Sequence, residues 1–221
     1  MNEDNSKSFR ELLKGFESNH VFAHMHPYDL YRQWLEAVWA LLNLPSDPQR
    51  FKATLDRYTY AQGQELGRLF GLYLVAVEEL PFRDILGTLF MRLDIKSVAA
   101  GQFFTGFSIA EMMARMQFNK DSFQAMVSER GTVSVCDPAV GSGVMLLAFA
   151  KVVHDSLGRE GTDRLRLYGN DIDIRCVNMC RIQLRMNGLD GFGRMAALAH
   201  LATQPEPAGV ELELETVSMP A

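Results

Sequence analysis

The first hundred residues carry apolar side chains at helical spacing. One run follows Pro27, a second follows Pro48, a third covers residues 62–80 and a fourth covers residues 82–93. Proline is favoured in the first turn of a helix, and apolar residues three and four apart share one helix face. The pattern therefore predicts a helical region over residues 1–100, with its aromatic side chains in the core between packed helices.

After Gly101 the pattern changes to strands that alternate with helices. The predicted elements are a strand at 132–136, a glycine-bearing turn at 137–143, a helix from Val144, a second strand at 165–170 and a helix at 174–187 that stops at Gly188. Strand, turn and helix form the half-unit of a doubly wound sheet, and two such units in a row predict parallel strands. We therefore expect an α/β fold, in which residues 101–221 form a partial doubly wound, Rossmann-like sheet.

Two further local signals concern the ends of elements. Ser108-x-x-Glu111 has the capping-box pattern that satisfies backbone donors at a helix start. Near the end of the sequence, residues 210–215 alternate apolar side chains with glutamate, which predicts an edge strand with one wet face.

Composition indicates an ordinary globular protein. Apolar residues make up 48% and charged residues 22% of the chain, and no apolar run is long enough to cross a bilayer. Residues 1–8 lack the basic flank and apolar stretch of a secretory signal, so we expect a cytoplasmic protein without membrane contact.

The formal net charge of −5 bears on nucleic-acid binding. Proteins that hold DNA unaided usually present a basic face that neutralises phosphates. Arg181 and Arg185 lie four apart on one predicted helix, but solvated helix arginines explain them more simply. Any DNA binding is therefore expected to depend on a partner or complementing chain.

Neither the cysteines nor the histidines form a metal pattern. We expect reduced, buried thiols at the three cysteines and surface or capping roles for the clustered histidines. The residues are Cys136, Cys176, Cys180, His20, His24 and His26. Cys176 and Cys180 have a spacing that suits a metal, but nothing nearby completes a site.

Candidate chemistry lies at the glycine turn and after the second strand. Glycines at 141 and 143 allow a sharp bend and a close approach of backbone to a ligand. An acidic residue at the end of the next strand, here Asp171, is placed to hold a ribose diol. Together these features predict a site for a nucleotide-like ligand, and a merely structural turn is the alternative.

The amino-acid sequences of three segments indicate a particular family more specifically than the glycine turn alone does. They are Gly101-Gln-Phe-Phe-Thr105, Asp137-Pro-Ala-Val-Gly-Ser-Gly143 and Tyr168-Gly-Asn-Asp-Ile-Asp173. In order and spacing they resemble the signature of adenine-N6 DNA methyltransferases, especially the modification subunits of type I restriction systems. With the lead-in Asp84-Ile-Leu-Gly87, the resemblance covers residues 82–188.

The resemblance implies S-adenosylmethionine as cofactor. It implies that Phe104 and Thr105 contact the methionine moiety, that Asp137, Ala139, Gly141 and Gly143 line its amino-acid end, that Asp171 binds the ribose hydroxyls, and that Ile172 packs on the adenine. Two positions depart from the family pattern. Val140 replaces a cysteine, and Gly106 replaces a common proline.

The family's catalytic segment is missing from the 221 residues. It reads Asn/Asp-Pro-Pro-Tyr/Phe, and its polar groups and aromatic ring hold the flipped target base. Nothing after Gly188 contains Pro-Pro, so we assign no catalytic residue. The sequence also stops before the further strands and the recognition region that the resemblance implies.

Three functions remain open. The chain is an active methyltransferase whose missing half comes from another chain, a cofactor-binding pseudoenzyme that regulates or assembles a restriction-modification complex, or a non-catalytic remnant. The strand at 132–136 has neighbours on one side only, near Leu165 and Val210. A bare strand edge invites pairing, so we expect a homo- or hetero-oligomer unless the helical region covers that edge.

Overall fold

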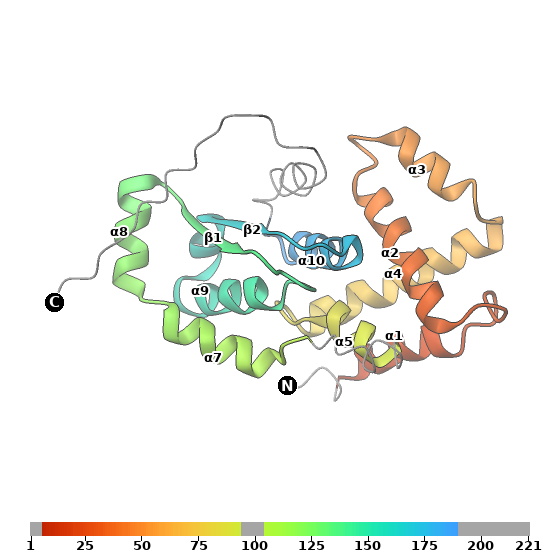
Figure 1. The fold of residues 1–221 in the computed structure, drawn as a ribbon, viewed down its shortest axis with the longest axis horizontal. Helices are drawn as coiled ribbons and strands as arrows, with labels where there is room; N and C mark the ends of the chain where they lie inside the picture. Colours follow the sequence, from red (N-terminus) through yellow and green to blue (C-terminus); the bar gives the residue numbers. More distant parts are fainter. Residues whose placement is uncertain (1–5, 94–103, 190–221) are drawn as a thin grey trace.

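The computed structural model describes residues 6–93 and 104–189. Within them the protein is mostly helical with a small parallel sheet, and so is α/β in character (Figure 1). The helical region comprises α1 (Lys7–Glu17), α2 (Pro27–Leu42), α3 (Pro48–Leu55), α4 (Tyr60–Glu79) and α5 (Ile85–Leu93). The second part comprises α7 (Phe107–Gln117), α8 (Lys120–Arg130), β1 (Val133–Asp137), α9 (Val144–Asp163), β2 (Leu165–Gly169) and α10 (Ile174–Met186).

The helix starts of the helical region follow local capping rules. Pro27 and Pro48 each occupy the first turn of their helix, as predicted. Helix α4 begins with a capping box in which Thr59 and Gln62 satisfy each other's backbone donors. Helix α1, which was not predicted, begins at the side chain of Ser6. The four predicted helices are confirmed.

Aromatic rings fill the core of the helical region. Trp34 is fully buried and makes edge contacts with Phe16 and Tyr73, at ring-centroid distances of 5.4 and 5.7 Å. Its indole N–H donates to the carbonyl of Leu66 at 3.2 Å, so the buried polar group is satisfied. The predicted core role is confirmed for most of the aromatic residues, but Tyr60 is 82% exposed.

The two strands are parallel and in the predicted order. Their register runs from Val133 opposite Leu165 to Asp137 opposite Gly169. Among the described residues no strand pairs with the other edge of β1. A cavity of about 220 Å³ is lined by residues of β1, α7 and α9. The predicted strand at 210–215 and the predicted boundary near residue 100 lie outside the described residues.

Helix α10 belongs to two cores at once. Cys176, Met179 and Ile182 pack into the core of the helical region. Cys180 and Leu184 pack into a second core beneath the sheet. Figure 1 shows α10 between the strands and α2, and its contacts with α2 are extensive. The sheet part and the helical region are therefore joined through one buried helix.

One predicted helix start is wrong. Helix α7 begins at Phe107 after Gly106, and no side chain caps it, so Ser108 is inside the first turn. Phe107, the first residue of the helix, is buried. The Glu111 carboxylate does not reach back to the helix start and instead accepts a hydrogen bond from the Arg115 guanidinium at 2.6 Å. The capping-box pattern at 108–111 is coincidental.

No helix in the described part of the chain is long and apolar enough to span a membrane. A cytoplasmic location stays a prediction from the sequence.

Candidate functional site

The described residues of the three signature segments meet at the carboxyl ends of the two strands. The backbone N–H of Gly141 donates to Asp171 Oδ2 at 2.9 Å, which joins the glycine turn to the end of β2. Phe104 lies over the same turn, since a Cβ added at Gly141 would come within 3.2 Å of its ring. Residues far apart in sequence thus converge where parallel strands usually bind ligands.

The glycines of the turn are required by its geometry. Gly141 and Gly143 have φ angles of +53° and +98°, a region that side chains with a Cβ disfavour. A Cβ at Gly143 would also lie 2.9 Å from the Cys180 sulfur, because α9 begins against α10. Helix α9 has no side-chain cap, so backbone donors at its amino end are available to an anionic group.

Asp171 is held in place but retains hydrogen-bonding capacity. Its Oδ2 accepts from Gly141 N, and its Oδ1 accepts from Asp173 N at 2.8 Å. Each carboxylate oxygen has two lone pairs, so each can accept one more hydrogen bond. A half-buried carboxylate with one free position on each oxygen suits a pair of neighbouring hydroxyls.

The other predicted residues differ in their surroundings. Ile172 follows Asp171 directly and is fully exposed, which leaves an apolar side chain in water beside the turn. Phe104 is half-buried against Phe90, with ring centroids 5.3 Å apart. Thr105 and Ala139 are exposed.

Asp137 shapes the first bend of the turn. It is half-buried, and its Oδ1 accepts from Ala139 N at 3.0 Å. Its carbonyl accepts from Asn170 N at 3.0 Å, which extends the strand pairing by one residue. The carboxylate thus fixes the turn locally.

A buried polar network, which the sequence did not reveal, supports the turn from below. Asp84 Oδ2 accepts from the Ser142 hydroxyl at 2.7 Å. Its Oδ1 accepts from Gly87 N at 3.0 Å and from Gln183 Nε2 at 2.8 Å. Gln183 Nε2 also donates to the Ser142 carbonyl at 2.9 Å. The network joins α5, the glycine turn and α10.

The network leaves no spare room. A Cβ at Gly87 would lie 2.3 to 2.6 Å from the Asp84 carboxylate oxygens and the Ser142 hydroxyl. Burial raises the pKa of Asp84, while the three hydrogen bonds to its carboxylate act in the opposite direction. Asp84 and Gly87 belong to the segment that resembles the family's lead-in. Nothing in the sequence marked Ser142 or Gln183 as their partners.

The thiols and histidines have structural surroundings. Cys176 and Cys180 are free and buried as predicted, and burial raises the pKa of Cys176 to about 12. The expectation of a buried thiol is wrong for Cys136, whose side chain leaves β1 on its exposed side. His26 caps α2 by accepting from Tyr28 N at 3.2 Å, which confirms a capping role. Within the described ranges, no three His, Cys, Asp or Glu side chains gather as metal ligands.

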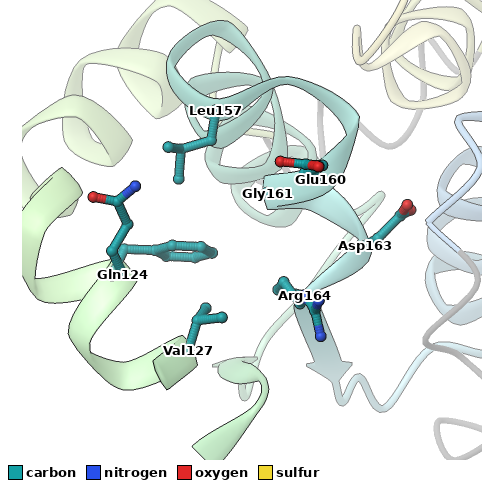
Figure 2. Close-up of a pocket in the computed structure, with 8 residues that line it drawn as sticks. Gln124, Val127, Leu157, Glu160, Gly161, Asp163 and Arg164 are labelled. Atoms are coloured by element: carbon teal, nitrogen blue, oxygen red, sulfur yellow. The ribbon is translucent and has the colours of Figure 1, made fainter. Parts of the chain in front are cut away.

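A cavity of about 440 Å³ lies at the opposite end of the sheet (Figure 2). Gln124 and Val127 come from α8, and Leu157 and Glu160 come from the end of α9. Its other boundary, Arg164, directly precedes β2, whereas Asp171 follows it. This cavity is therefore separate from the candidate site.

A glycine turn between strand and helix, with an acid after the next parallel strand, is typical of proteins that bind nucleotide-like ligands. Residues 84–212 match the family described as N-6 DNA Methylase. The match covers more than half of the sequence, and the chain therefore belongs to this family.

One curated relative is informative about the kind of family member. The chain is 34% identical over 93 residues to the protein named "Type I restriction enzyme MpnII methylase subunit" of Mycoplasma pneumoniae (strain ATCC 29342 / M129 / Subtype 1). The alignment covers 42% of this chain and 15% of the relative. No solved structure gives a significant match.

Proposed function

We propose that this chain supplies the S-adenosylmethionine-binding part of an adenine-specific DNA N6-methyltransferase in a restriction-modification system. The observation that carries the proposal is the hydrogen bond from Gly141 N to Asp171, which joins the two halves of the family signature at one site. On this proposal β1 and β2 are the first strands of a Rossmann-like methyltransferase sheet. The bound cofactor would supply an electrophilic methyl group.

The residues of the site suit the parts of that cofactor. The uncapped amino end of α9 offers backbone donors to the methionine carboxylate, whereas the N–H groups of Ala139, Gly141 and Gly143 are already used to hold the turn. Asp171 has one free acceptor position on each oxygen for the ribose hydroxyls. Stacking of adenine on Ile172 would remove a fully exposed apolar side chain from water. Phe104 borders the same turn, and it and the next residue, Thr105, would contact the methionine chain.

Methyl transfer needs groups that lie outside this sequence. The Asn/Asp-Pro-Pro-Tyr/Phe segment that would hold the target amine is absent from the 221 residues. Without it the amine is not positioned in line with the methyl group, and positioning is a large part of such catalysis. We propose that further sequence or a partner chain supplies this half, and that it joins the sheet at the edge of β1 with which no described strand pairs.

Calorimetric titration with S-adenosylmethionine tests the site. We expect Asp171→Ala to weaken binding about tenfold or more, because two hydrogen bonds to a charged acceptor are lost. Asp171→Asn keeps the side-chain shape and separates the loss of charge from a disturbed turn. Asp163→Ala, at the opposite end of β2, is the matched control and should bind as the wild type does. Wild-type affinity in both Asp171 variants would refute the ribose assignment.

The missing catalytic segment favours a second candidate, a cofactor-binding pseudoenzyme that regulates or assembles a complex. Transfer of labelled methyl from S-adenosylmethionine to DNA distinguishes the two. Binding with transfer supports an enzyme. Binding without transfer, alone and with a candidate partner chain, supports the pseudoenzyme. Absence of both means that the turn is only structural.

A further inference from the structure

A cleft lined by arginines separates the helical region from the start of α10. Its volume is about 580 Å³. Arg32 comes from α2, Arg50 from α3, Arg57 from the segment after α3, and Arg175 from α10. We call this the arginine cleft.

The charge of the arginine cleft is opposite to that of the whole chain. Four arginines line it, together with only two carboxylates, Glu36 and Asp173. The complete sequence has a formal net charge of −5. A local excess of positive charge on an acidic protein concentrates anions at that place.

Three of the four arginines already have a carboxylate within 4.0 Å. Arg57 contacts Glu36 at 3.0 Å, and Arg175 forms a two-pronged contact with Asp173. Arg32 is 3.9 Å from Asp29, at the limit of an ion pair. No carboxylate among residues 6–93 and 104–189 lies within 4.0 Å of the Arg50 side chain, and this side chain is exposed.

Polar atoms on α10 beside the cleft lack partners. Asn178 lines the cleft, is 6% exposed, and its Oδ1 has no hydrogen bond within the described part of the structure. One turn later, Arg181 is 8% exposed and its Nε has no acceptor there either. A buried polar group without a partner costs free energy. The Arg181 Nε–H needs an acceptor such as a phosphate oxygen or water, whereas the Asn178 Oδ1 needs a donor unless the amide is turned so that its NH₂ takes this place.

Arg181 and Arg50 also repel each other. The Arg181 guanidinium lies over the Trp39 ring, 5.1 Å from its centre, and no described carboxylate pairs with it. Burial lowers the pKa of Arg181, and the positive charge of Arg50 lowers it further. An anion placed between the two arginines would remove this repulsion.

We infer that the arginine cleft binds phosphate groups of a DNA strand. Guanidinium groups suit phosphate because they donate paired hydrogen bonds in a fixed plane, and the Asn178 amide can turn to donate as well. Asp173 and Ile174, which line the cleft, follow Asp171 and Ile172 directly, so the cleft adjoins the candidate cofactor site. The choice of DNA over a small phosphate rests on the proposed function. On this inference the chain itself contacts DNA. A partner chain would add further contacts but would not be required for binding, in contrast to the expectation from the net charge.

Fluorescence anisotropy of a labelled short duplex with the full chain, without cofactor, tests the inference. In about 50 mM salt we expect Arg50→Gln to weaken DNA binding roughly threefold to tenfold, and to reduce the slope of log affinity against log salt by about one. Arg130→Gln is the matched control, because Arg130 is also an exposed arginine, on helix α8, which does not line the cleft. It should bind DNA within about a factor of two of the wild type.

Three outcomes would overturn the inference. Wild-type DNA affinity in Arg50→Gln is one, and an equal loss in Arg130→Gln is another, since it indicates only a general charge effect. The third concerns inorganic phosphate at constant ionic strength. It is met if phosphate raises the melting temperature of the wild type but not of Arg50→Gln, while DNA affinity does not depend on Arg50. That result would assign the cleft to a small phosphate ligand.

Calorimetry with S-adenosylmethionine keeps the two proposals apart. Arg50→Gln should bind the cofactor as the wild type does, because Arg50 does not belong to the glycine turn or to the end of β2. If the wild type binds DNA through Arg50 but does not bind S-adenosylmethionine, the proposed function fails and the DNA contact stands.

Discussion

Asp84 is a buried carboxylate whose partners are all neutral. It is 4% exposed, and it accepts hydrogen bonds from Gly87 N, the Ser142 hydroxyl and the Gln183 amide. None of these donors carries a charge that offsets the loss of water around an ionised carboxylate. Burial therefore outweighs the hydrogen bonds, and the pKa of Asp84 is raised above its ordinary value.

The raised pKa predicts a pH dependence of stability. The folded protein binds the Asp84 proton more tightly than the unfolded chain does. The resulting stabilisation is complete below the unfolded pKa, near pH 4, and is lost as pH rises through the folded pKa. Asp84→Asn cannot ionise, so its melting temperature relative to wild type should rise with pH. Thermal unfolding followed by circular dichroism at several pH values measures this difference.

A surface replacement provides the control for Asp84→Asn. Asp163 is exposed and pairs with Arg159, so Asp163→Asn should not become relatively more stable as pH rises. A pH-independent difference between Asp84→Asn and wild type would mean that Asp84 ionises in the folded protein as it does in the unfolded chain.

At the residue scale, local motifs indicated which residues form the turn but not the buried network that supports it. Gly141, Gly143 and Asp171 belong to local motifs, and the structure brings them together. Ser142 and Gln183 were missed because their contacts with Asp84 join positions 58 and 99 apart in sequence. No short pattern carries such information.

Helix α7 shows how tertiary packing decides where an element begins. Gly106 precedes the helix with φ of −62° and ψ of 138°, a conformation that serine also adopts at helix starts. A Cβ at this position would meet nothing within 4 Å. A serine side chain would therefore fit at position 106 and could cap the helix, which glycine cannot do.

Two replacements test this helix start. Gly106→Ser should stabilise the protein by about 0.5–1 kcal/mol, through a new cap and a less flexible unfolded chain. Ser108→Ala should change the free energy of unfolding by less than about 0.5 kcal/mol, because Ser108 does not cap the helix. Urea unfolding measures both. A loss near 1 kcal/mol in Ser108→Ala would restore the capping-box interpretation.

Elements with strong local signals were predictable, and weakly patterned ones were not. Pro27 and Pro48 set the starts of α2 and α3, and Gly188 ends α10 with a φ of +68°. Helix α8 escaped prediction because Phe123 is its only buried residue, so its sequence has almost no apolar periodicity. Its start depends on a single cap, Asn119.

At the scale of the whole molecule, α10 links two cores that the sequence assigned to separate regions. The apolar pattern of residues 174–187 predicted one helix but could not indicate that its buried side chains pack into two different cores. Ile182 and Leu184 are both fully buried, on opposite sides of this link. Loss of either core would expose one side of α10.

The shared helix predicts a single unfolding transition. Both tryptophans, Trp34 and Trp39, lie in α2, so their fluorescence reports the helical region, whereas far-ultraviolet circular dichroism reports every helix. The two signals should give the same urea midpoint, as expected for one cooperative unit. Separate midpoints would show that the helical region and the sheet part unfold independently.

Cys136 offers a natural site for attaching a fluorescent dye. It is exposed and directly precedes Asp137, whereas Cys176 and Cys180 are buried with raised pKa values. Maleimide dyes reach exposed thiols and not buried ones, so labelling would select Cys136 in the unaltered chain. A fluorophore there would sit at the mouth of the glycine turn and would register arriving small molecules in real time.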